Sequence, residues 1–270
     1  ADLAQNLRQV LMALIEDERK NNTFRDQKYW YPIAHATYDV EEIMETVESL
    51  CSYQTTMLKK TVQFESEFSN LLPCKESVMV NSGSSANLLM AFALVNPQLK
   101  LLAAGDEILV PSVTWPTQVW AAIMAGLKVK FVDANPNTLN MDLDDLADKI
   151  TSQTRAIFLV HVLGNPCDME SITALCQKHD LLLVEDCCEA LGAKFEGQAV
   201  GTFGIASSFS FFVSHHITTM EGGMICSQEE ALSDLFRVLR AHGWARSLKY
   251  TKMLDLNGFD DRYLFLNWGF

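Results

Sequence analysis

The feature of this sequence that most constrains its fold is an alternation of short apolar runs and helix-like segments, which begins at residue 77. Strands that alternate with helices predict a largely parallel sheet covered by helices on both faces. The sequence therefore predicts an α/β fold. The expected strands are Val78–Val80, Glu107–Val110, Val129–Val132, Ala156–Val160, Leu181–Val184 and Ser207–Phe212, and the expected helices are Ala86–Leu94, Thr117–Gly126, Leu143–Lys149 and Met169–His179.

The start of the sequence carries helical signals instead. Residues 1–28 predict one amphipathic helix, because their apolar residues recur at helical spacing before the charged run Glu16–Lys20. Farther on, Asp39 with Glu42 three residues later is typical of a capping box. We therefore expect a second helix to begin at this point.

Composition and charge narrow the classes of function. The 270 residues are 49% hydrophobic, which is enough for a sizeable core. A net charge of −13 disfavours a nucleic-acid partner, whose phosphates would be repelled. No apolar run is long enough to cross a bilayer and the start lacks a signal-peptide pattern, so we expect a cytoplasmic protein with no membrane partner. The seven cysteines include no Cys-x-x-Cys pair, so we expect free thiols and no metal site.

Small polar residues follow the first expected strand. The run Asn-Ser-Gly-Ser-Ser-Ala-Asn at 81–87 lies between that strand and a helix, where small side chains and free N–H groups suit an anion such as a phosphate. It is not a P-loop, because no Gly-Lys-Ser/Thr follows. A serine-rich turn that only caps the helix explains the run equally well.

Two other strand ends carry residues that suit a flat, protonated ring. Trp115 follows the strand at 107–110 and can stack on such a ring, or can pack beneath a loop. Asp186 follows a buried strand, where a carboxylate needs a positive partner. That partner is a protonated pyridine nitrogen or, in the alternative, an arginine or a helix start.

The most specific run lies at 207–223, where a buried strand ends in His215 and His216 and then in Glu-Gly-Gly. Two adjacent histidines are often surface residues or metal ligands. Their side chains point in different directions and no third ligand is near in sequence, so chelation by both is disfavoured.

Taken in order, these runs resemble the DegT/DnrJ/EryC1/StrS family of sugar aminotransferases, which use pyridoxal phosphate on the fold of aspartate aminotransferase. The shared motifs are Ser-Gly-Ser-Ser-Ala-Asn at 82–87, Trp-Pro-Thr at 115–117, Glu-Asp-Cys-Cys-Glu at 185–189 and Ser-Phe-x-x-Ser-x-x-x-Thr-Thr-x-Glu-Gly-Gly at 210–223. The likeness runs from about Tyr31 to Phe270, with further agreement at 31–34, 163–166 and 240–244.

The resemblance implies a role for each matching residue. Gly83, Ser84 and Ser210 would hold the cofactor phosphate, and Trp115 would stack on the pyridine ring. Asp186 would pair with the ring nitrogen and keep it protonated, which strengthens the ring as an electron sink. Glu189 would lie close by, at the ring hydroxyl or the substrate.

His215 stands where ordinary members of the family carry a lysine, a difference that is shared by the branch of nucleotide-sugar 3-dehydratases. Imidazole cannot make the stable covalent link that a lysine amine makes, so it retains only acid–base chemistry. The resemblance thus implies a non-covalently held cofactor, pyridoxal 5'-phosphate or pyridoxamine 5'-phosphate. It also implies a nucleotide-linked 4-keto-6-deoxyhexose that loses its C3 hydroxyl, and glutamate as amino donor.

Several features depart from the family pattern. A sister branch carries an iron–sulfur cluster, but no cysteine follows Cys226, so too few ligands remain for one. The run Thr-Met-Leu-Lys-Lys at 56–60 replaces a Thr-Met-Gly-Glu turn, which leaves the choice of sugar open. The family continues past residue 270 into a small C-terminal domain, so we expect a truncated member of a homodimeric family. The expected regions are a helical extension (1–30), a cofactor-binding large domain (31–240) and the start of a C-terminal region (241–270).

Two other functions compete with dehydration. A sugar aminotransferase would need a lysine at position 215, where the sequence has histidine. A catalytically silent homologue that binds a nucleotide sugar would keep the fold and lose the chemistry. Binding of pyridoxamine phosphate and release of ammonia from a 4-keto sugar separate these alternatives from a dehydratase.

Overall fold

The computed structural model describes residues 2–21, 38–249 and 263–270. The chain divides into two compact units, residues 1–63 and 64–270. The motif at 31–34 and the part of the first expected helix beyond residue 21 lie outside the described residues. The domain boundaries expected at residues 30 and 240 stay predictions.

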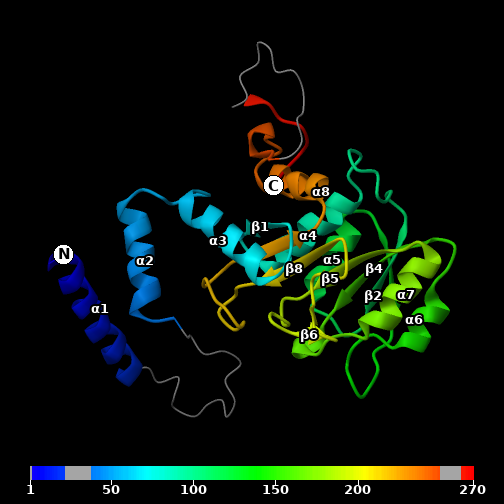
Figure 1. Ribbon diagram of the computed structural model, residues 1–270, viewed down its shortest axis with the longest axis horizontal. Helices are drawn as coiled ribbons and strands as arrows, with labels where there is room; N and C mark the ends of the chain where they lie inside the picture. The colour runs from blue at the N-terminus through cyan, green and yellow to red at the C-terminus, as the bar shows by residue number, and fades with distance from the viewer. Residues whose placement is uncertain (1, 22–37, 250–262) are drawn as a thin grey trace. The chain divides into compact units, whose positions relative to one another are not determined.

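In the smaller unit, the described residues form helix α1 (Asp2–Asn21) and helix α2 (Val40–Cys51), which are labelled in Figure 1. The expected capping box is present. The Asp39 carboxylate accepts from the backbone N–H of Glu42, and the Glu42 carboxylate accepts from the Asp39 N–H at 2.7 Å. Helix α3 (Lys59–Leu71) follows, and Lys60 donates to the Glu45 carbonyl at 3.0 Å. The run at 56–60 therefore leads into a helix.

The larger unit is built on a seven-stranded sheet with the order β1-β9-β8-β5-β4-β2-β3. Six of these strands run parallel, and only β9 runs antiparallel, between β1 and β8. The predicted α/β fold with a mostly parallel sheet is confirmed. The strands are β1 (Glu76–Val80), β2 (Glu107–Pro111), β3 (Lys128–Val132), β4 (Thr154–Val160), β5 (Leu182–Asp186), β8 (Ala206–Ser210) and β9 (Gly223–Ser227), with a separate hairpin of β6 (Lys194–Phe195) and β7 (Gln198–Ala199).

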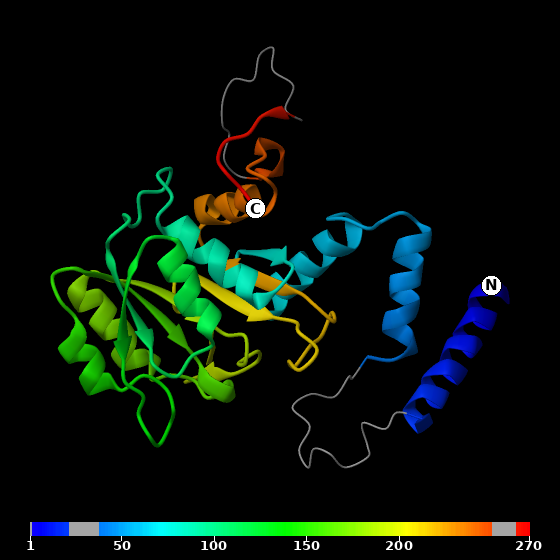
Figure 2. The ribbon, with the colours of Figure 1, turned by 180° about the vertical axis from the view of Figure 1, so that it is seen from behind.

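The sheet has a hydrophobic core on each of its two faces. Successive side chains of a strand point to opposite faces, so neighbouring residues pack into different cores. On β4, Ala156 and Phe158 join the core under α4, α5 and α8, whereas Ile157 and Leu159 join the core under α6 and α7. Figures 1 and 2 show these helices around the sheet from opposite directions. The helices are α4 (Gly83–Leu94), α5 (Pro116–Met124), α6 (Leu143–Lys149), α7 (Met169–His179) and α8 (Glu230–Arg240).

A third core packs aromatic rings against the β8–β9 part of the sheet. Phe68 of α3 lies edge-on to Phe209, with ring centroids 5.2 Å apart, and to Phe211 at 5.5 Å. Cys226 of β9 is buried in the same core. This packing holds the strand that precedes His215.

The sequence prediction lacked strand β9, helix α8 and the β6–β7 hairpin of the larger unit. The last expected strand ends at Phe212, before Gly223. Strand β9 begins at that glycine and lies between β1 and β8, so β1 joins the sheet only through β9. The end of the described chain also packs on this unit, since the Phe270 N–H donates to the Leu239 carbonyl at 2.8 Å.

Candidate functional site

The site lies at the edge of the sheet where the parallel strands end. Strands β1, β2, β5 and β8 lead there to Gly83, Trp115, Asp186 and Ser210 respectively. In open parallel sheets, ligands bind beyond this edge. The sheet thus brings four predicted site residues to the same side of the molecule.

The turn after β1 is packed tightly against β8 and β9. A methyl group added at Gly83 would lie 2.7 Å from the Cys188 sulfur and 2.7 Å from the Ser210 Cβ. One added at Gly223 would collide with the Ser82 carbonyl. The backbone therefore comes as close to its neighbours as glycine allows, at a point where the N–H groups of α4 favour an anion.

The first turn of α4 also explains the serines of this motif. Ser82 caps the helix, since its hydroxyl accepts from the Ser85 N–H at 3.0 Å. The capping role considered for this run therefore applies to Ser82. Ser84 is half-buried in the same turn, and Ser210 ends β8 directly beside Gly83. Both arrangements, a cap and an anion cradle, are compatible in one turn.

Asp186 is the last residue of β5 and is only 3% exposed. Its carboxylate accepts from the Asn87 amide at 2.7 Å and from the Cys188 N–H at 3.0 Å, and the Ser208 hydroxyl donates to the Asn87 carbonyl at 2.6 Å. These partners are neutral and differ from the arginine or helix start considered from sequence. A buried carboxylate with neutral partners is suited to a cationic ligand group, such as a protonated ring nitrogen.

Trp115 precedes α5 and is 69% exposed, so packing beneath a loop does not explain its position. Behind it, Gln118 is fully buried and donates to the Phe158 and Leu159 carbonyls at 3.1 and 3.2 Å. These bonds fix the first turn of α5 to β4. The exposed indole face is available for stacking.

Glu189 is held by a turn from the neighbouring strand. The Leu163 N–H donates to the Glu189 carboxylate at 3.0 Å, and Leu163 has a left-handed backbone with φ 52°. Asn140 braces the turn, because its side chain accepts from the Val162 N–H at 3.1 Å and donates to the Asn165 carbonyl at 3.0 Å. The carboxylate position is therefore set by backbone geometry.

His215 lies in the turn after β8, where its N–H donates to the Phe212 carbonyl at 3.0 Å. Partial burial lowers the pKa of His215 below its ordinary value. The Glu189 and Asp186 carboxylates act in the opposite direction, whereas His216 adds to the lowering. The imidazole is thus coupled electrostatically to both carboxylates, and its burial favours the neutral ring, the form that can accept a proton.

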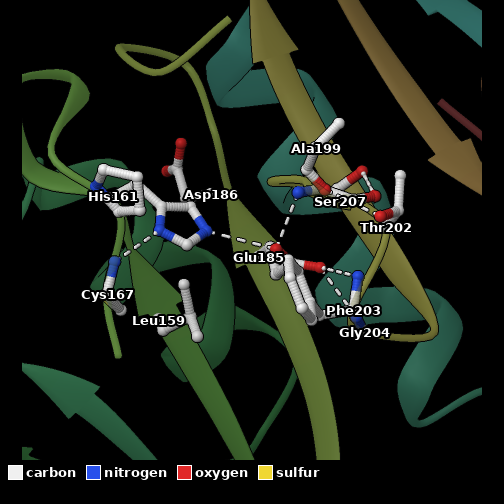
Figure 3. A network of polar contacts seen from close by, with 12 residues as sticks. Leu159, His161, Cys167, Glu185, Asp186, Ala199, Thr202, Phe203, Gly204 and Ser207 are labelled. Carbon is white, nitrogen blue, oxygen red and sulfur yellow. Dashed lines mark hydrogen bonds and ion pairs between the residues drawn. The ribbon is translucent and has the colours of Figure 1, made fainter. Parts of the chain in front are cut away.

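A second polar network lies just behind Asp186 and is drawn in Figure 3. The Cys167 N–H donates to His161 Nδ1 at 3.0 Å, so Nε2 carries the ring proton and donates to Glu185 at 3.1 Å. The Glu185 carboxylate also accepts from the N–H groups of Gly201, Phe203 and Gly204 at 2.7–2.8 Å. These bonds attach the loop after β7 to the end of β5.

This network contains a group of potential metal ligands, namely His161, Glu185 and Cys187. Their donor atoms already have other uses. Glu185 accepts four hydrogen bonds and His161 Nε2 carries a proton. Burial raises the pKa of the Cys187 thiol well above its ordinary value, which disfavours the thiolate that binds metals. The arrangement is that of a hydrogen-bonded support.

Sequence reasoning missed the residues that support the site: Asn87, Ser208, His161, Glu185 and Asn140. Asn87 belongs to the predicted phosphate motif, and its burial on the inner face of α4 was the available signal. Its contact with Asp186 joins segments 99 residues apart, which no local pattern reveals.

The fold is that of the large domain of pyridoxal-phosphate-dependent aminotransferases, and the comparisons agree. The model of the DegT/DnrJ/EryC1/StrS aminotransferase family matches residues 37–262, and the chain belongs to this family. It is 39% identical over 244 residues to GDP-4-keto-6-deoxy-D-mannose 3-dehydratase of Yersinia pseudotuberculosis, covering 89% of this chain and 62% of the relative. The chain therefore spans less than two thirds of that protein's length.

Two similar solved structures belong to GDP-4-keto-6-deoxymannose-3-dehydratase. One is a mutant with bound GDP-perosamine, with a TM-score of 0.85, 40% identity and coverage of 89% of this chain and 63% of the other. The second holds a trapped PLP–glutamate geminal diamine, with a TM-score of 0.82, 38% identity and coverage of 89% of this chain and 63% of the other.

Substitution of Gly83 by alanine tests the tight turn. The added methyl would press on Cys188 and Ser210, so we expect a loss of about 1–3 kcal/mol in the free energy of unfolding. Ser84→Ala, which adds no atom to the same turn, is the matched control. Denaturant unfolding measures both variants, and equal midpoints for Gly83→Ala and the parent chain would show that the turn has room for a side chain.

Proposed function

We propose that this chain carries the cofactor-binding domain of a nucleotide-sugar 3-dehydratase. The reaction is removal of the C3 hydroxyl of a nucleotide-linked 4-keto-6-deoxyhexose, with pyridoxal 5'-phosphate and pyridoxamine 5'-phosphate as the two forms of the cofactor. The observation that carries the proposal is His215, which lies at the lysine position of the family and is electrostatically coupled to Asp186 and Glu189. The chemistry belongs to deoxysugar biosynthesis.

The residues present fit this cofactor. Gly83, Ser84 and Ser210 would hold the phosphate at the start of α4, and Trp115 would cover one face of the ring. Asp186 would hold the proton on the ring nitrogen, because its two known hydrogen bonds leave acceptor capacity for a third. When bound, pyridoxamine phosphate supplies an amine for the 4-keto carbon and a ring that accepts electrons.

His215 would act as the acid–base group. Its lowered pKa favours the neutral ring, whose free nitrogen can take up a proton and later return it. Glu189 would stabilise the protonated ring. A lysine amine at this position would attach the cofactor covalently, whereas the imidazole leaves it free to carry the amine.

The substrate and partners follow from the relatives. The similar dehydratases act on a GDP-linked sugar, which supports GDP as the nucleotide. The structure with glutamate on its cofactor supports glutamate as the amino donor. We further propose a homodimer in the cytoplasm. Among the described residues, none of the helices combines the length and apolar character that a membrane span requires.

The absence of a lysine at position 215 predicts that the cofactor is not covalently attached. Borohydride treatment of the chain loaded with pyridoxal phosphate, followed by mass spectrometry, should give no phosphopyridoxyl adduct. His215→Lys is the positive control, since it restores an amine at that place. A stoichiometric adduct on the parent chain would overturn the proposed role of His215.

The coupling between Glu189 and His215 predicts a shift in the pH dependence. A carboxylate stabilises imidazolium and so raises the pKa of His215; its removal in Glu189→Gln lowers that pKa further. Because the neutral ring is the base, activity falls as pH drops through this pKa. We therefore expect the acidic limb of the pH–rate profile to move to lower pH in Glu189→Gln. An unmoved or upward-shifted limb contradicts the coupling.

A further inference from the structure

Two cysteines that lie far apart along the chain share one hydrogen-bond partner, the Ser77 hydroxyl, at the edge of the sheet. The Cys74 sulfur lies 3.4 Å from the Ser77 hydroxyl oxygen, and the Cys226 sulfur lies 3.3 Å from that same oxygen. Ser77 and Cys226 are directly paired between β1 and β9. The two thiols are thus held on one side of the same cross-strand pair.

The two sulfurs have different access to solvent. Cys74 precedes β1 and is half-buried, whereas Cys226 is 1% exposed within the aromatic core. A small oxidant can therefore reach Cys74 first. Cys226 is protected from solvent but lies against the same Ser77 hydroxyl as Cys74, which is the position of a resolving thiol.

The local chemistry favours reaction at Cys74. The Cys226 thiol, together with Ser77 and Ser69, lowers the pKa of Cys74 to about 7, although burial and Glu76 act in the opposite direction. Burial raises the pKa of Cys226 well above its ordinary value. Cys74 therefore has substantial thiolate character at neutral pH, and the thiolate is the nucleophilic form.

We propose that Cys74 and Cys226 are a peroxide-sensitive dithiol that closes to a reversible disulfide between the start of β1 and β9. The Cys74 thiolate attacks one peroxide oxygen, forming an S–O bond as the O–O bond breaks and water leaves after protonation. The Cys226 sulfur then attacks the Cys74 sulfur, forming the S–S bond, while the hydroxyl leaves as water with the Cys226 proton. Two thiols are oxidised by two electrons and hydrogen peroxide is reduced to two waters.

The disulfide would link the outermost strand at one edge of the sheet to its neighbour. Strand β1 is one of the two edge strands, and β9 is its neighbour in the sheet. The bond would join these strands at the end opposite to Gly83, because Ser77 pairs with Cys226 and Val80 pairs with Gly223. It would therefore leave the proposed cofactor residues in place.

The test treats the full chain with hydrogen peroxide, blocks remaining thiols and maps the digest by mass spectrometry. We expect a peptide that links Cys74 to Cys226, its loss on treatment with dithiothreitol, and a fall in free thiols from seven to five. In Cys226→Ser the resolving thiol is gone, so Cys74 should persist as a sulfenic acid that dimedone traps. Cys176→Ser, which removes a buried thiol of a different core, should leave the linked peptide unchanged.

Three results would overturn the proposal. They are the absence of the linked peptide in the oxidised parent chain, a disulfide between other cysteines, and direct oxidation of Cys74 to the sulfonic acid with Cys226 still reduced. If Cys226→Ser does not fold, Cys226→Ala supplies the same measurement without a polar atom in the core.

Discussion

Replacement of His215 by asparagine is expected to lower the dehydration rate by about 10²–10⁴-fold, the range that a general acid–base group contributes. Asparagine preserves much of the shape of the ring but cannot take up a proton near neutral pH. The turn around position 215 is held by the backbone bond to Phe212, so the fold should be retained. The measurement is turnover of a GDP-linked 4-keto-6-deoxyhexose, with circular dichroism as the check on folding.

The adjacent histidine provides a matched control. His216 is exposed and stands next to His215 in the same turn, and its charge is one of the influences that lower the pKa of His215. We expect His216→Asn to retain most of the activity. Equal losses in the two variants would mean that the turn as a whole, and not the imidazole of His215, is what matters.

Replacement of Asp186 by asparagine is expected to lower turnover by about 10²-fold or more, because a neutral amide cannot hold the proton on the ring nitrogen. The effect on stability should be much smaller. If the Asn87 side-chain amide rotates by 180°, its oxygen can accept from the new amide at position 186 and its NH₂ group can donate to the Ser208 hydroxyl. Each of these buried side chains then keeps a hydrogen-bond partner.

The comparison variant for this prediction is Asn87→Ala. It leaves the Asp186 carboxylate charged but removes its buried hydrogen-bond donor, so we expect a larger loss of stability than in Asp186→Asn. Denaturant unfolding and steady-state turnover, measured on both variants, distinguish the effect of the Asp186 charge from the effect of its hydrogen bond to Asn87. An Asp186→Asn variant with the parent rate would remove Asp186 from the proposed chemistry.

Much of the fold was predictable because the signals are local. Helices α6 and α7 begin and end where the sequence predicted, since Asp142 and Asp168 cap them by accepting backbone N–H groups. Strand β9 was missed because it follows the Glu-Gly-Gly turn directly and inserts antiparallel between two parallel strands. An alternation of strands and helices contains no information about such an insertion.

In the site, too, features with local sequence signals were predictable and contacts between distant segments were not. The residues that would touch the cofactor stand at strand ends, where the chain order alone places them, as with Gly83 and Asp186. The supporting contacts join distant segments: Asn87 to Asp186, and Glu185 to the loop at 201–204. The pKa of His215 depends on burial and on carboxylates from another strand, so it could not be predicted from sequence.

The measurement that tests the central claim most directly is product analysis with GDP-linked 4-keto-6-deoxymannose, glutamate and pyridoxamine phosphate. If the chain supplies dehydration chemistry through His215, ammonia should be released in step with a sugar product that lacks one oxygen atom, and His215→Asn should abolish both signals. The CDP-linked sugar, run in parallel, reports on the nucleotide. Accumulation of a 4-amino sugar without ammonia would contradict the account, because it would make the protein an aminotransferase.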